Sequence, residues 1–334
     1  MTDQPLLLLA QQKRQRWMFA INTLLSSILL LAVISLLVGD FLINPFDGLS
    51  SLEQQLLWQL RLPRLFGAIV VGGALALSGA TLQILLRNVL AEPGVIGVSG
   101  GASVAMVLLI TFIPAAATTL GYTAGAIIGA IGFTFILVTM AKVSRLTTTR
   151  LLLVGVALGI ISNAVVTLAF YFSDELSLRQ LMYWLMGSLG AVNLSQLMVL
   201  LVPVLVMWWI IRQSTQLDKI MLGEVHALQL GIDVFKLRWK LIVAVSVLVG
   251  VSVAVAGVIG FVGLVVPHIV RLLLGTENRY LLPTSVLAGS AFLLFSDLIA
   301  RTVMENAELP LGVVTTLFGA PVFIWMLIKN HDYR

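Results

Sequence analysis

The sequence contains no cysteine and little charge: 10% of its 334 residues are charged and three are histidine. Without cysteine, the chain can form neither a disulfide nor a thiolate metal site. His226, His268 and His331 are too scattered in the sequence to suggest a metal site, so we expect none. So little charge also excludes a soluble domain of this length, which would need a more polar surface.

Catalytic motifs are also missing. The sequence has no Walker A loop, so this chain is not expected to use ATP through a P-loop. It has neither a His-Glu-x-x-His nor a Gly-x-Ser-x-Gly pattern. We therefore expect no catalytic residues, no cofactor on this chain and no enzyme activity, and a membrane-embedded enzyme is the remotest alternative.

Apolar residues dominate instead: 59% of the residues are hydrophobic, and the mean hydropathy is +1.06. A helix that spans a bilayer needs about 20 apolar residues, so the longest uncharged run must hold two spans broken near Pro114. Backbone groups in lipid must be satisfied within helices. We predict an all-α polytopic protein, a single transmembrane domain over 1–334 with about ten spans. The uncharged runs are 17–39, 65–86, 93–141, 151–173, 180–211, 241–270, 280–296 and 309–328.

Charge predicts the orientation. Lys13, Arg14 and Arg16 precede the first run, which is too long for the core of a cleavable signal peptide, so we expect it to be a span. With the N-terminus inside and ten spans, both termini are cytoplasmic, and four of the 20 basic residues lie outside. Those four are Arg61, Arg64, Arg179 and Arg301.

Two short segments resemble each other. Gly94–Val98 and Gly257–Phe261 share a Gly-Val-Ile-Gly pattern and lie in opposite halves of the chain. Inverted repeats with interrupted spans often flank a transport pathway. The segment 177–184, which ends in Tyr183-Trp184, is expected to form a short interfacial half-helix. Small residues at four-residue spacing, such as Gly72 and Ala76, predict close helix packing.

A charged island interrupts the apolar runs at about 213–239, which we expect to be the largest cytoplasmic loop. At its centre, Gly223-Glu-Val-His-Ala-Leu-Gln-Leu-Gly231 predicts a short amphipathic helix. Glu224 lies where the helix dipole favours an anion, and Gly231 closes the helix. Such a helix indicates a docking partner, although a solvated loop with one helical turn is the simpler interpretation.

Ionisable groups within spans are candidate functional residues. Asp297 is the clearest, but Arg301, four residues later, can neutralise it as a local ion pair. Arg61 and Arg64 lie at the outer mouth of the second span, where they could bind lipid headgroups or an acidic partner. Gln83 and the fifth-span Asn163 could line a path or bridge helices.

Several blocks in order resemble one family over nearly the whole length. The Gly-Glu-x-x-Ala-x-x-x-Gly pattern at 223–231 resembles the coupling motif of ABC-importer permeases. The complete set resembles the FecCD-type permease subunits of type II ABC importers, above all those that carry cobalamin. Arg87 and Val89 depart from the family pattern, which has an acidic residue and a proline at these positions. The blocks are 58–64, 88–94, 150–160, 178–184, 260–268, 307–314 and 319–325.

The resemblance implies a homodimer with a path along its two-fold axis. Two cytoplasmic ATPase subunits, which bind ATP and Mg²⁺, would lie below it and one periplasmic binding protein above it, in the bacterial inner membrane. By position, the resemblance also implies three roles: ATPase coupling for Glu224, Val225, His226, Ala227 and Gly231; binding-protein docking for Arg61, Arg64 and Arg301; and cytoplasmic gates for Thr148, Thr149, Asn88 and Leu90.

The expected function is therefore a permease subunit that forms the path for cobalamin by ATP-driven alternating access. Haem or a ferric siderophore is the alternative cargo. An ion-coupled secondary transporter is the alternative class. It is disfavoured because we find no acidic residue at the middle of a span, Asp297 being near the outer end of its own, and because of the helix expected at 223–231.

Overall fold

The computed structural model describes residues 4–39, 50–94, 97–113, 118–143, 148–304 and 307–329, and all regular structure within these ranges is helical. The predicted all-α fold is therefore confirmed. In chain order the elements are α1 Gln4–Leu37, α2 Ser51–Gln55, the π-helical η1 Leu56–Arg61, α3 Leu62–Leu85, α4 Val98–Phe112, α5 Thr119–Val143, α6 Thr148–Phe172, α7 Glu175–Met186, α8 Leu194–Arg212, α9 Ser214–Met221, α10 Glu224–Gln229, α11 Val234–Ala256, α12 Val262–Leu274, α13 Asn278–Thr302 and α14 Leu311–Lys329.

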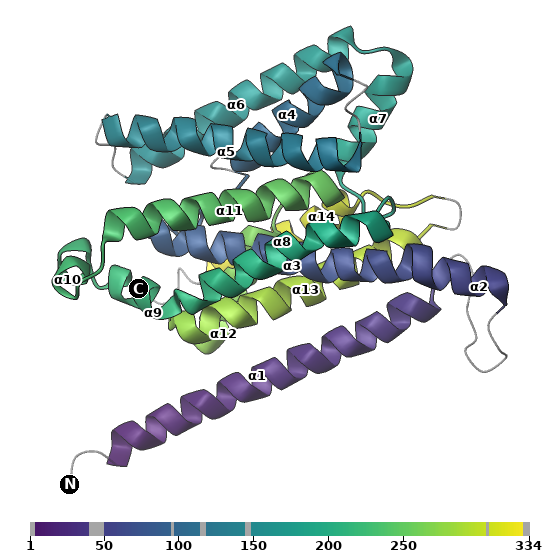
Figure 1. Ribbon diagram of the computed structural model, residues 1–334. Helices are drawn as coiled ribbons and strands as arrows, with labels where there is room; N and C mark the ends of the chain where they lie inside the picture. Colours follow the sequence, from purple (N-terminus) through teal and green to yellow (C-terminus); the bar gives the residue numbers. More distant parts are fainter. Residues whose placement is uncertain are drawn as a thin grey trace.

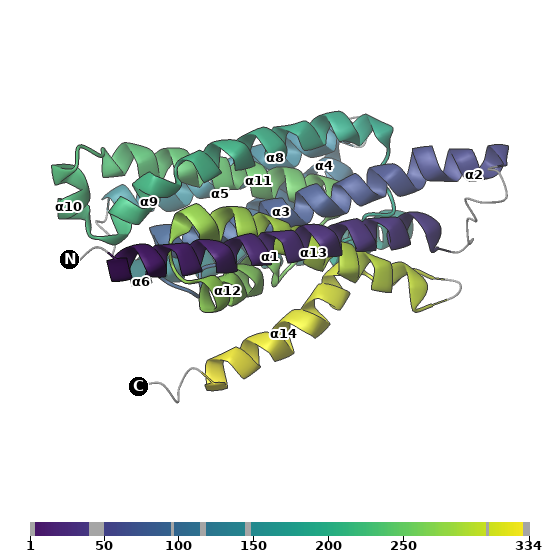
Figure 2. The same ribbon diagram turned by 90° about the horizontal axis from the view of Figure 1, so that it is seen from below.

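The helices form an elongated bundle with two distinct ends (Figure 1). The short helices α9 and α10 lie at one end, and α2 lies at the other (Figures 1 and 2). The first turns of α1 and the last turns of α14 lie at the same end as α10 (Figure 2). The loop helices that carry the predicted coupling segment therefore share an end of the molecule with both terminal helices.

Seven described helices are long and apolar enough to cross a membrane, and three shorter apolar helices accompany them. The shorter ones are Val98–Phe112, Val262–Leu274 and Leu311–Met326. The count of ten spans stays a prediction, because a short helix can cross only part of a bilayer about 30 Å thick. Residues 175–186 form the separate helix α7, as predicted for a half-helix.

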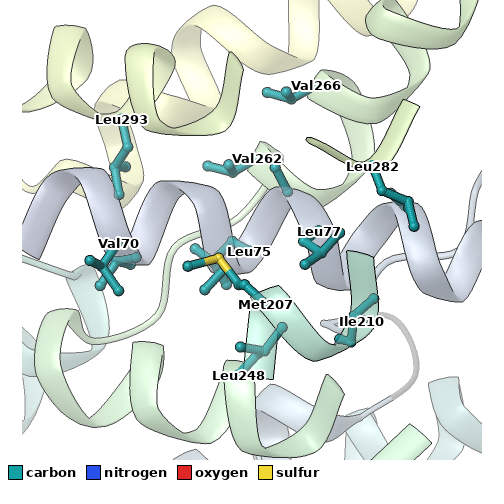
Figure 3. Close-up of a cluster of buried hydrophobic side chains, with 14 of the residues drawn as sticks. Val70, Leu75, Leu77, Met207, Ile210, Leu248, Val262, Val266, Leu282 and Leu293 are labelled. Carbon is teal, nitrogen blue, oxygen red and sulfur yellow. The ribbon is translucent and has the colours of Figure 1, made fainter. Parts of the chain in front are cut away.

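Helix α3 is the centre of the main core. Nearly every residue from Val70 to Leu85 is buried, and side chains of α8, α11, α12 and α13 converge on this helix (Figure 3). Its apolar character all round is expected of a helix enclosed by others. A second cluster joins α4 and α5 to α11.

Small residues allow these helices to approach closely. A Cβ placed on Gly72 or Gly79 of α3 would collide with the backbone carbonyl of Gly289 or Gly263, respectively. Gly101 of α4 and Gly129 of α5 meet in the same way. The predicted role of the small-residue spacing is confirmed at these crossings, where backbone proximity replaces side-chain interdigitation.

Helix α1 is the exception, because only 6% of its most apolar window is buried within the chain. Polar contacts attach it at both ends. At one end, Trp17 Nε1 donates to Thr284 Oγ1 at 3.0 Å. At the other, Arg61 donates to the carbonyl of Leu36 at 2.6 Å, and Arg301 donates to the carbonyl and hydroxyl oxygens of Ser35, both at 2.7 Å.

Candidate functional site

The predicted coupling helix is present as α10. It begins at Glu224 and ends at Gln229, and Gly231 adopts a left-handed φ of 78°. The amides of Gly231 and Ile232 donate to the carbonyls of Leu228 and Ala227, both at 3.0 Å. These two bonds form a Schellman motif, which explains why glycine is suited to this position. The helical interpretation of the charged island is confirmed.

The surface of this segment exposes apolar side chains beside polar ones. Val225 is 67% exposed and Leu228 60%, and His226 is also exposed. Ala227 is fully buried, so it anchors the helix. Of Glu224 only the backbone lies within the described structure. Leucine and valine side chains exposed beside polar groups are typical of a surface that another protein covers.

A cavity of about 400 Å³ adjoins α10 between α8, α9 and α11. Three lysines and one aspartate contribute to its wall: Lys219, Lys236, Lys240 and Asp233. Asp233 also caps α11, because its carboxylate accepts from the amide of Lys236 at 3.0 Å.

Arg87 connects the end of α3 to this region. Its Nη2 donates to the carbonyl of Ile220 in α9 at 2.8 Å. Its φ is 47°, a left-handed conformation that is uncommon for a residue with a Cβ. Helix α9 is also joined to α13, since the amide of Asn278 donates to Asp218 at 3.0 Å. Helix α9, which directly precedes α10, is thus hydrogen-bonded to the turn after α3 and to the start of α13.

The predicted gate residues lie on two separate segments. Asn88 and Leu90 form a tight turn directly after α3, in which the amide of Leu90 donates to Asn88 Oδ1 at 2.9 Å. Leu90 is 47% exposed. Thr148 and Thr149 begin α6, and their side chains lie outside the described residues.

The two similar glycine segments meet inside the bundle. Each precedes a short helix, and Gly97 and Phe261 have left-handed φ values of 82° and 69° at the start of α4 and α12. Glu92, two residues before the first segment, accepts from the amide of Phe261 at 2.8 Å and so caps the helix that follows the second segment. Of the first segment, residues 95 and 96 lie outside the described structure.

Two cavities open around this junction. One of about 250 Å³ is lined by Glu92, Ser99, Phe261 and Thr316 among others. The other, of about 560 Å³, is lined mainly by α4 and α6 and includes Asn163. Both contain Gly94, Ser99 and Val258, so they adjoin one another. Apart from Glu92, the polar side chains of these two walls carry neutral hydroxyl or amide groups.

Asn163 and Gln83, which the sequence allowed either to line a path or to bridge helices, have different positions in the structure. Asn163 lines the larger cavity. Gln83 bridges helices, because its Nε2 donates to the carbonyl of Leu264 at 3.2 Å. Glu92 is the group that sequence reasoning missed, since it follows a span rather than lying in one. A carboxylate directly before Pro93, next to a repeated glycine pattern, was the available signal.

The outer arginines do converge, and they are enclosed. Arg61 is 8% exposed and Arg301 7%, and the side chain of Arg64 is 12% exposed. Arg64 pairs with Glu308 at 2.6 Å and with Asp297 at 2.9 Å. Their guanidinium groups thus hold the subunit together, and the Arg64–Glu308 pair forms the exposed edge of the cluster.

The closest ion-pair partner of Asp297 is not Arg301, the residue expected from the sequence. Arg301 Nε is 3.8 Å from its carboxylate, so the contact exists but is long. The closer partner is Arg64 of α3. Sequence spacing reveals a partner on the same helix, whereas this one is supplied by helix packing.

Comparisons with known proteins agree with this architecture. A family model described as the FecCD transport family matches residues 27–329. The vitamin B12 import system permease protein BtuC of Vibrio cholerae is 60% identical over 97% of this chain and 98% of that protein. The protein of the same name from Klebsiella pneumoniae is 47% identical over 97% of this chain and 96% of its own length.

A solved structure has the same fold. It is an inward-facing metal-chelate type ABC transporter, 34% identical, with a TM-score of 0.84 over 92% of this chain and 98% of that chain. With its apolar helices, the chain is a multi-pass protein of the bacterial inner membrane. Because the family model and these relatives cover nearly its full length, the chain belongs to the FecCD transport family.

Proposed function

We propose that this chain is the permease subunit of an ABC importer and forms the path for vitamin B12. The observation that carries the proposal is the 60% identity, over 97% of the chain, to a vitamin B12 import permease. The site is consistent with it, because weakly polar cavities adjoin a helix break deep in the bundle. The chain would act as a homodimer of subunits with about ten spans and no cofactor of its own, with both termini in the cytoplasm.

The proposed path passes the junction of the two glycine segments. Thr316 of α14 and Asn163 of α6 contribute to the cavities there, and α14 leans away from the bundle beyond this point (Figure 2). Many large apolar side chains of α6 and α14 are exposed, and a second copy is proposed to cover part of this surface. Asn88, Leu90, Thr148 and Thr149 are proposed to close the path towards the cytoplasm.

The cytoplasmic partner is a separate ATPase that binds ATP and Mg²⁺, and α10 is its proposed docking element. Val225 and Leu228 supply apolar contact area, His226 borders it, and Glu224 with Gly231 sets the ends of the helix. Movement of α10 would reach the gate turn at Asn88 through α9 and the Arg87 hydrogen bond.

The periplasmic partner is a substrate-binding protein. Of the three arginines proposed for docking, Arg64 lies closest to the surface through Glu308, whose side chain is 44% exposed. An acidic group on the binding protein would compete with Glu308 for this guanidinium. Arg61 and Arg301 would contribute by fixing the outer end of α1 beside it.

Transport in proteoliposomes tests the function. The chain is reconstituted with its ATPase and binding protein, and uptake of labelled cobalamin, haem and a ferric siderophore is measured with ATP or a non-hydrolysable analogue. We expect ATP-dependent uptake of cobalamin. Uptake that follows an imposed proton or sodium gradient without ATP would instead support the ion-coupled carrier.

A metal chelate is the second candidate cargo, because the structural neighbour at 34% identity is a metal-chelate type transporter. The higher identity to vitamin B12 permeases favours cobalamin. Uptake of haem or siderophore without cobalamin uptake would retain the importer and overturn the cargo.

A further inference from the structure

A cavity of about 480 Å³ separates the cytoplasmic part of α1 from α12 and α13. It shares no lining residue with the two cavities of the proposed path. Its volume is within the range of about 300–1,000 Å³ that holds small ligands. Its wall is composed of Gln12, Lys13, Arg16, Trp17, Leu273, Leu274, Gly275 and Tyr280.

The wall is positively charged. Lys13 and Arg16 contribute two cationic groups, and no acidic residue lines the cavity among the described residues. Glu277, behind the wall, pairs with Lys13 at 2.6 Å and with Arg279 at 3.0 Å. These contacts neutralise part of the local charge. Arg16 has no ion-pair partner in the described part of the chain, so it is available to an anion.

Two aromatic rings indicate where the cavity lies along the membrane normal. The rings of Trp17 and Tyr280 lie 4.6 Å apart, and Trp17 is fixed by its hydrogen bond to Thr284. Trp17 also begins the first apolar run of the chain. Tryptophan and tyrosine favour the boundary between headgroups and hydrocarbon, so the cavity lies at the level of lipid headgroups.

An apolar rim continues from the charged wall. Leu272 is 50% exposed and Leu273 is 73% exposed at the end of α12, and α1 contributes an almost unburied apolar helix on the other side. The site therefore combines cationic groups for a phosphate with a surface for hydrocarbon. Basic cavities between membrane helices on the cytoplasmic side are suited to anionic lipids.

We propose that this cavity binds an anionic phospholipid of the cytoplasmic leaflet. Lys13 and Arg16 contact its phosphate, and its acyl chains lie along Leu272 and Leu273. The lipid would fill the space between α1 and the bundle, and so supplement the few polar contacts that hold this helix in place.

Binding is tested on the full-length chain by native mass spectrometry and thermal unfolding with phosphatidylglycerol, phosphatidylcholine or inorganic phosphate at equal phosphate concentration. Arg16→Gln is the test variant, because Lys13→Gln would also break the pair with Glu277. Arg14→Gln is the matched control, since Arg14 is exposed on the same helix but does not line the cavity.

We expect phosphatidylglycerol to stay bound to the chain in native mass spectrometry and to raise its unfolding temperature. Phosphatidylcholine and inorganic phosphate should do neither. Arg16→Gln should weaken phosphatidylglycerol binding about fivefold, as for one basic contact near a membrane surface, and Arg14→Gln less than about twofold. Equal loss in both variants, or equal binding of phosphatidylcholine, would overturn the proposal. An equal shift with inorganic phosphate would overturn the lipid as the occupant.

Discussion

Arg64 Nε donates to both carboxylate oxygens of Asp297, at 3.0 and 3.1 Å, across 233 positions of sequence. The two residues belong to α3 and α13, which pack against each other along the bundle. The carboxylate of Asp297 is almost fully buried, with 1% exposed. The pair therefore joins the first turn of α3 to the C-terminal part of α13, at a position where water has almost no access to the carboxylate.

We predict that Asp297→Asn strongly destabilises the chain. The substitution removes the buried anion that Arg64 and Arg301 share, and leaves Arg64 with the partly exposed Glu308 alone. Breaking a buried pair in this way costs about 3–5 kcal/mol. Denaturant unfolding in detergent measures the change. Glu175→Gln is the control, because the Glu175–Arg179 pair is exposed and its loss should cost about 0.5 kcal/mol or less. Equal costs for the two variants would mean that the buried pair contributes nothing.

Gly79→Ala should destabilise the contact between α3 and α12. The added methyl group would occupy the position of the Gly263 carbonyl, so the two backbones must separate. Overpacking of this kind costs about 1–3 kcal/mol. Gly132→Ala on α5 is the matched control, since its new methyl group would have no neighbour within 4 Å. Thermal unfolding of both variants compares them, and an unchanged Gly79→Ala would show that the helices can shift without cost.

Arg87→Gly should reduce transport without preventing assembly. Glycine keeps the left-handed backbone conformation at no steric cost but removes the hydrogen bond to Ile220. A charge-assisted hydrogen bond contributes about 1.5–3 kcal/mol, so cobalamin transported per ATP hydrolysed could fall about tenfold.

The readout for Arg87 is uptake divided by ATP hydrolysis, beside co-purification of the ATPase. Arg87→Lys retains a donor and should restore much of the coupling. A normal ratio in Arg87→Gly would exclude this hydrogen bond from the transmission of movement.

Val225→Asp should prevent docking of the ATPase. A carboxylate in place of this exposed valine would be desolvated beneath the partner, with an expected loss of at least about tenfold in affinity. Gln229→Asp places the same charge at another exposed position of α10. Affinity for the purified ATPase compares the two variants. Equal binding by Val225→Asp and the unchanged chain would place the docking surface elsewhere.

The sequence by itself determined the helical class, the approximate position of the apolar helices and the short helix at Glu224–Gln229. These are local properties. A run of apolar residues can satisfy its backbone in lipid only as a helix. At Gly231 the helix α10 ends, because the amides of Gly231 and Ile232 donate to carbonyls three and five residues earlier in the sequence. The resemblance carried by ordered sequence blocks also predicted the family.

Only the tertiary structure decided the partners of the buried charges. Arg64 meets Asp297, and Glu92 meets the amide of Phe261, because helices and loops distant in sequence pack side by side. Sequence spacing finds neighbours on one helix but not across helices. The exposure of the three arginines likewise depends on how α1 lies against α3 and α13. The basic cavity beside Trp17 also forms between helices that are distant in sequence.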